Sequence, residues 1–203
     1  MAQTDAASMT RGDSGIGVWI FRVLLVAGAA FMLYSWFQPW WSADFAVIPG
    51  VNDMVLHPWG VDAAAQVTGN VDESAFEMPY PQLFAGFMWT YLGVCMLALA
   101  ASLFVKRRFR LGPVHLSLAT IIILLVGLSY MMAVGLALGI GELKASAAGA
   151  NFIGRSNVLE PGSGAKLKMV SDLVIGYWLA LGAGGVLTLL GLVRFLFVRT
   201  PKV

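Results

Sequence analysis

The sequence contains few of the side chains from which metal, redox and catalytic sites are built. Of its 203 residues, one is cysteine, two are histidine and 12% are charged. The single Cys95 excludes disulfides within the chain, thiolate metal clusters and a dithiol relay. His57 and His115 lie in segments that we predict to face opposite sides of a membrane, which excludes a haem held by two histidines of this chain. No glycine-rich phosphate loop follows a strand, so nucleotide binding has no support.

Long apolar runs take up nearly half of the chain instead. Hydrophobic residues make up 59% of the sequence, and the mean hydropathy of +0.78 is typical of a membrane protein. Four segments are each long enough to cross about 30 Å of hydrocarbon as a helix. They cover residues 17–38, 83–105, 114–138 and 173–197. We therefore predict an all-α membrane protein, a bundle of four transmembrane helices. None of the four carries an ionisable group at its centre, which argues against a pump, a proton-coupled transporter or a voltage sensor.

The distribution of basic residues predicts the orientation of the bundle. With a cytoplasmic N-terminal tail, nine lysines and arginines lie on the cytoplasmic side and four on the other, the bias expected of cytoplasmic loops. The cytoplasmic parts are then residues 1–16, 106–113 and 198–203, and the outer loops are residues 42–81 and 140–171. The expected location is the cytoplasmic (inner) membrane of a prokaryote. The run KRRFR in the short turn follows from this topology and does not indicate nucleic acid.

The two predicted outer loops differ in character. Residues 43–59 combine weak alternation, the turn-forming PGVND and a second run with β-branched and aromatic residues, which predicts a small β-hairpin over the helix ends. Residues 140–171 contain several glycines among alanine and serine. That composition predicts a segment that is flexible or that depends on a partner for order.

Tryptophans gather where the first span ends, in SWFQPWWSADF at residues 35–45. A belt of tryptophan and tyrosine at the membrane interface explains one or two of them. An aromatic pocket or a contact between subunits is the alternative. The belt does not account for the third tryptophan of this cluster, and Trp89 and Trp178 in other spans lie deep for headgroup anchors. The residues that we assign to this candidate contact surface are Trp40, Trp41, Trp59, Trp89 and Trp178.

The sequence NDMVLHPW offers the best candidate metal ligands, Asp53 and His57. A histidine with carboxylate or methionine partners can hold copper or zinc. Two or three ligands from one loop fall short of a complete site, so we expect no metal and no cofactor within this chain unless a second subunit completes the site.

Small residues indicate where helices approach closely. The fourth span has Gly176, Ala180 and Gly184 at a spacing of four, and the first span contains AGAA at residues 27–30. Such residues let helix backbones pack tightly in lipid. The spacing leaves open whether the contact lies within the chain or between subunits.

The layout of four spans, a larger first outer loop and a tryptophan cluster after the first span is similar to that of claudin-like tetraspans. That family has a paired-cysteine motif in its first outer loop, and this loop has no cysteine. Architecture by itself transfers no function.

These features predict a protein without a catalytic site of its own. The expected function is that of an accessory or structural subunit that packs against other subunits of a larger membrane complex, with the lipid bilayer as its other partner. One alternative is a small subunit of a membrane oxidoreductase or monooxygenase that contributes to a shared metal or quinone site near His57. Another is a tetraspan that binds a lipid or other apolar ligand among the outer aromatic residues.

Overall fold

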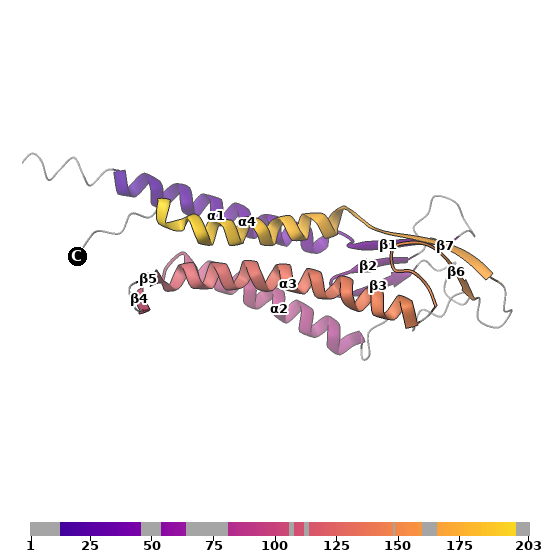
Figure 1. Cartoon of the computed structure of the whole chain (residues 1–203). Coiled ribbons are helices and arrows are strands. Elements are labelled where there is room, and N and C mark those ends of the chain that lie inside the picture. The colour runs from indigo at the N-terminus through magenta and orange to yellow at the C-terminus, as the bar shows by residue number, and fades with distance from the viewer. Residues whose placement is uncertain are drawn as a thin grey trace, which may run out of the picture.

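The computed structural model describes residues 13–45, 54–63, 81–105, 108–111, 114–147, 149–159 and 166–197. This part of the chain contains four long helices and seven short strands (Figure 1). The helices are α1 (Asp13–Phe37), α2 (Pro81–Ser102), α3 (Leu118–Ala147) and α4 (Ile175–Phe197). The strands are β1 (Trp41–Phe45), β2 (Met54–His57), β3 (Gly60–Ala63), β4 (Arg108–Leu111), β5 (Val114–Ser117), β6 (Gly154–Leu159) and β7 (Lys166–Leu173).

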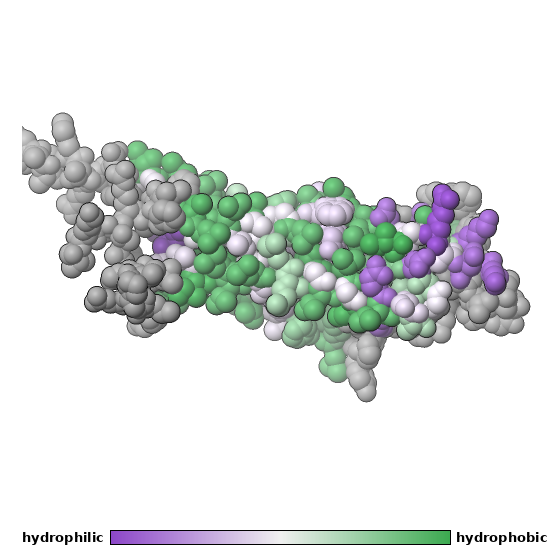
Figure 2. All heavy atoms as spheres, viewed as in Figure 1, coloured by the Kyte–Doolittle hydropathy of each residue, from purple (hydrophilic) through white to green (hydrophobic). Residues whose placement is uncertain are grey.

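All four helices are long and apolar enough to cross a membrane, as the sequence predicted, and they support a multi-pass membrane protein. Apolar side chains cover the helical part of the molecule, whereas hydrophilic side chains gather over the sheet (Figure 2). Helix α3 packs against α4, α4 packs against α1, and α2 lies mainly on α3. Figure 1 shows α2 leaning away from the other helices toward its first residues.

A five-stranded antiparallel sheet covers one end of the bundle, which we call the sheet end. Its strand order is β3-β2-β1-β7-β6. Strand β1 lies at its centre, where Trp41 is opposite Leu56 of β2 on one side and Leu173 of β7 on the other. The predicted hairpin is therefore present as β1 and β2, but it belongs to a larger sheet. The all-α prediction therefore holds for the long helices but not for the sheet end, where the chain forms five strands.

Two segments differ from their prediction. The loop 140–171 was predicted to be flexible or to depend on a partner for order, yet it contains β6 and most of β7, because β7 gains a partner in β1 from the first loop. Residues 114–117 lie in the predicted third span, but they pair with 108–111 as the β4-β5 hairpin at the opposite end of the bundle. The third helix thus begins at Leu118 rather than at 114.

Helix α3 also extends beyond the predicted end of its span at 138. The additional residues include Glu142, Leu143, Lys144 and Ala145, which are strong helix formers. The helix then ends in a Schellman motif: the Ala150 amide donates to the Ala145 carbonyl at 2.8 Å and the Gly149 amide donates to the Ser146 carbonyl at 3.0 Å. Gly149 has a φ of 70°, which glycine adopts without steric cost. This extra helix carries α3 from the bundle onto the sheet.

Candidate functional site: an apolar cavity at the sheet end

Two adjacent tryptophans, Trp40 and Trp41, follow the end of α1, and both are buried. Trp40 is 2% exposed and Trp41 is 1% exposed. The Trp40 amide donates to the Leu56 carbonyl at 2.8 Å, and the Val174 amide donates to the Trp40 carbonyl at 3.1 Å. The backbone at this exit is therefore held from two sides, by β2 and by the start of α4.

The two indoles also form specific contacts. Trp40 Nε1 donates to the Ser35 carbonyl at 3.3 Å. Trp41 stacks on Phe152 with ring centroids 5.0 Å apart and an interplanar angle of 3°, and its Nε1 donates to the Phe152 carbonyl. Phe152 follows the end of α3, so this contact joins the segment between α1 and α2 to the segment between α3 and α4.

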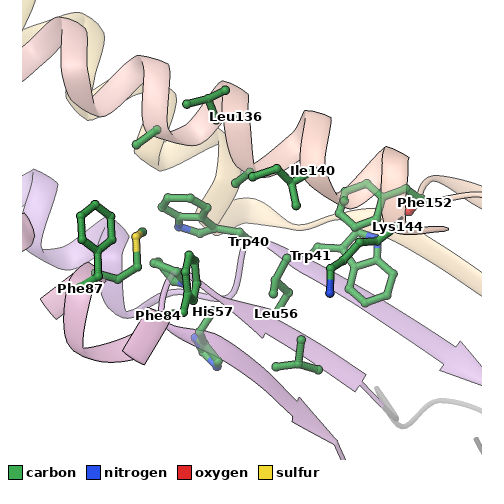
Figure 3. A pocket seen from close by; sticks show the side chains of 16 residues that line it. Trp40, Trp41, Leu56, His57, Phe84, Phe87, Leu136, Ile140, Lys144 and Phe152 are labelled. Atoms are coloured by element: carbon green, nitrogen blue, oxygen red, sulfur yellow. Dashed lines mark hydrogen bonds between the residues drawn. The ribbon is translucent and has the colours of Figure 1, made fainter. Parts of the chain in front are cut away.

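A cavity of about 230 Å³ lies beside these tryptophans. Helix α3 forms one wall, and the first turns of α2 with strands β1 and β2 form the other (Figure 3). Its lining residues are Trp40, Trp41, Leu56, His57, Pro58, Val61, Phe84, Phe87, Met88, Ala133, Leu136, Ala137, Ile140, Gly141, Lys144 and Phe152. Nearly all of them are apolar, as in pockets that bind small hydrophobic molecules.

Two lining residues connect the cavity to the lipid-facing surface. Phe87 on α2 is 65% exposed and Leu136 on α3 is 58% exposed, although both also line the cavity. Both belong to helices that are long and apolar enough to cross a membrane. The cavity therefore reaches the apolar surface between α2 and α3.

The position of the cavity along α3 defines its depth. Leu136 follows Leu118, the first residue of the helix, by 18 residues, or about 27 Å at about 1.5 Å per residue. Lys144 follows Leu118 by 26 residues, or about 39 Å on the same rise. Since the hydrocarbon core is about 30 Å thick, a helix that begins at one boundary places Leu136 near the other boundary and Lys144 among the head groups.

Only two of the lining residues are ionisable, His57 and Lys144. His57 stacks on Trp59 with centroids 4.7 Å apart, and its Nε2 lies 3.6 Å from Oδ2 of Asp62. Burial lowers the pKa of His57 more than the nearby Asp62 carboxylate raises it. The imidazole is therefore neutral at pH 7, and Lys144 is the charged group of the lining.

Next to the cavity lies an aromatic cluster centred on Trp36, which is fully buried. Its ring centroid lies 6.2 Å from that of Trp89, 6.3 Å from Trp40, 6.4 Å from Tyr130 and 6.5 Å from Trp59. Edge-to-face and offset arrangements at such distances are favourable for aromatic rings. The cluster joins α1, α2, α3 and the β2-β3 turn into one packed unit.

The structure separates the five tryptophans of the predicted contact surface. Trp40 and Trp41 face the interior of the chain, and Trp59 is half-buried between His57 and Trp89, whose ring stacks on it at 5.2 Å. Trp89 and Trp178 are 42% and 58% exposed. Only the last two are thus largely open to lipid or to another subunit.

The predicted metal ligands are only partly within the described structure. Asp53 lies outside the described residues, while Nε2 of His57 lies 3.6 Å from Oδ2 of Asp62. Within the described ranges, no three histidine, cysteine, aspartate or glutamate side chains come together as a metal site would need. A metal or quinone site shared with another subunit at His57 stays a prediction.

Sequence reasoning missed most of the cavity wall. Phe84, Phe87 and Met88 lie at helical spacings of three and four on α2, and Ala133, Leu136, Ala137, Ile140 and Lys144 repeat such spacings on α3. This periodicity could have indicated one common face on each helix. That the two faces oppose each other across a gap could not be predicted from it.

Comparison of the chain with protein-family models and with curated proteins found no match.

Proposed function

We propose that this multi-pass membrane protein binds a lipid or another apolar ligand in the cavity at its sheet end and has no catalytic site of its own. The observation that carries the proposal is the apolar cavity of about 230 Å³ that opens between Phe87 and Leu136. A ligand that leaves the bilayer for this cavity exchanges one apolar surrounding for another. Binding then depends on shape complementarity with the aromatic wall.

The proposal includes an orientation. We propose that the sheet end faces away from the cytoplasm, because the basic residues of the chain are concentrated on the opposite side. Helix α1 begins, and α4 ends, at the end that carries the β4-β5 hairpin (Figure 1). The cavity then opens into the outer leaflet.

The test is to fill the cavity and analyse the lipids that co-purify. Ala133→Trp and, separately, Ile140→Trp each place an indole in the lining. We expect each variant to retain several-fold less lipid than the wild type in lipid extracts of the detergent-purified protein, measured by mass spectrometry. Leu125→Trp is the control, because Leu125 is on the same helix, is 63% exposed and does not line the cavity. Equal retention in all four proteins would refute the proposal.

A second proposal is that the protein is an accessory subunit of a larger membrane complex. The observation that favours it is Trp89, which is 42% exposed although it precedes Ser102, the last residue of α2, by 13 residues, or about 20 Å. That depth lies inside a hydrocarbon core of about 30 Å, where a headgroup belt does not explain an exposed indole. A protein neighbour would explain it.

Native mass spectrometry of the detergent extract tests this second proposal. We expect a second protein subunit to co-purify with the wild type and to be lost from Trp89→Ala. Trp178→Ala is the matched control, because Trp178 is three residues from the start of α4, at a depth where a belt accounts for it. A wild-type chain that purifies without any partner would count against an accessory function.

A further inference from the structure

We infer that the occupant of the cavity is a bilayer phospholipid with an anionic head group, whose charge lies beside Lys144 while one of its acyl chains lies along the aromatic wall. This inference rests on the proposed ligand-binding function and names the chemical class of the ligand. It depends on the position of Lys144, on its charge and on the size of the cavity.

Lys144 occupies the polar end of an otherwise apolar wall. On α3 it follows Ala133, the first lining residue, by 11 residues, or about 16 Å along the helix axis. Ala133 and Leu136 lie at the level of the hydrocarbon and Lys144 lies at the level of the head groups. The apolar part of the wall thus lies where the acyl chain of a lipid would be, and the cationic Lys144 lies where its head group would be.

The Lys144 side chain is directed toward the cavity. Figure 3 shows it near Trp41, with its amine on the side of Leu56. In the described part of the chain, no carboxylate forms an ion pair with Lys144. The nearest acid on the same helix is Glu142, and residues two apart on a helix point in different directions. Among the described residues, the amine thus has no carboxylate partner that would compete with an anion at the cavity mouth.

His57 does not compete for this role. Its lowered pKa leaves the imidazole neutral at pH 7, and the nearby Asp62 carboxylate is 72% exposed. Lys144 is accordingly the one group of the cavity lining that favours an anionic head group. A single basic residue near a membrane surface contributes about 1 kcal/mol to the binding of an anionic lipid.

The size of the cavity limits what enters it. At about 230 Å³ it is smaller than the roughly 300–1,000 Å³ of most small-molecule pockets. A whole two-chain lipid does not fit, whereas a segment of one acyl chain does. The second chain stays in the bilayer through the opening at Phe87 and Leu136, which are 65% and 58% exposed.

The experiment compares two lipids with the same chains and different head groups. The detergent-purified full chain is titrated with dioleoyl phosphatidylglycerol or dioleoyl phosphatidylcholine, and bound lipid is counted by native mass spectrometry. We expect the wild type to favour the anionic lipid by about fivefold and Lys144→Gln to lose this preference. Lys144→Arg keeps the charge and should keep the preference. Lys168→Gln is the control, because Lys168 is exposed on β7 and does not line the cavity.

The outcomes separate this inference from the function on which it rests. If Ala133→Trp lowers binding of both lipids while Lys144→Gln keeps the wild-type preference, the cavity binds lipid but the anionic class is wrong. If Ala133→Trp binds both lipids as the wild type does, the ligand-binding function itself fails. A third arm adds oleate as a competitor. If oleate at equal concentration displaces phosphatidylglycerol from the wild type, the ligand is a free fatty acid and the proposal of a phospholipid is wrong.

Discussion

Gly127→Ala should lower the free energy of unfolding by about 3 kcal/mol, the upper part of the range measured for overpacked cores. A methyl group on Gly127 of α3 would lie 2.6 Å from Oγ1 and 2.7 Å from the backbone nitrogen of Thr188 on α4. The Thr188 hydroxyl is itself hydrogen-bonded to the Gly184 carbonyl at 2.9 Å, so it cannot turn away without breaking that bond. Because a backbone atom is among the obstacles, the two helices would have to separate.

A second glycine on the same helix gives the control. A methyl group on Gly135 would meet no atom within 4 Å. Gly135→Ala should therefore leave the stability unchanged or raise it by up to about 1 kcal/mol, through the better helix propensity of alanine. Unfolding by sodium dodecyl sulfate in mixed micelles, followed by tryptophan fluorescence, measures both variants. Equal midpoints for the two would contradict the close packing of α3 on α4.

The small residues of the fourth span thus find their partners within the chain. A methyl group on Gly184 would lie 2.5 Å from Cγ of Met131 on α3, and one on Gly176 would collide with the carbonyl of Pro39 at the end of α1. The spacing of four predicted a close helix contact, and the structure identifies α3 and α1 as the neighbours. A spacing on one helix cannot identify its partner, because it describes only one of the two surfaces.

The spanning helices were predictable because the bilayer imposes their length and composition on the sequence itself. Of the sheet, only the hairpin of β1 and β2 was predicted, although β3 follows β2 after two residues. Strand β7 had a short signal, since its first four residues, KLKM at 166–169, alternate polar and apolar. The glycine-rich surroundings outweighed it. Its pairing with β1 joins residues far apart in the chain, and such pairing depends on tertiary packing that local pattern does not contain.

The cavity at the sheet end was predictable only in part, because it too depends on contacts between segments far apart in the chain. The tryptophans after the first span were conspicuous, and the structure does bring Trp40 and Trp41 to the candidate site, but as its wall rather than as an exposed surface. Lys144 was assigned to a loop, because a span of about 20 residues already crosses the hydrocarbon. Its place at the head-group level appears only once α3 is seen to continue to Ala147.

Trp36→Ala should lower the free energy of unfolding by about 4 kcal/mol, as expected for the removal of a fully buried large aromatic side chain. Trp36 is 0% exposed, and its ring contacts those of Trp40, Trp59, Trp89 and Tyr130. These four rings come from the exit of α1, the β2-β3 turn, α2 and α3. The substitution therefore leaves a void where the bundle meets the sheet, and α2 has few other contacts with α1 to compensate.

Trp36→Phe distinguishes packing from hydrogen bonding. The buried Trp36 Nε1 has no hydrogen-bond acceptor among the described residues, so phenylalanine removes an unpaired donor while it keeps most of the ring contacts. We expect Trp36→Phe to cost clearly less than Trp36→Ala, because the phenyl ring leaves a smaller void than the methyl group does. Trp178→Ala is the control, because Trp178 is 58% exposed and should change stability by less than about 0.5 kcal/mol. If Trp36→Ala unfolded at the same detergent concentration as Trp178→Ala, the aromatic cluster would not hold the sheet on the bundle, and the wall of the cavity would need another support.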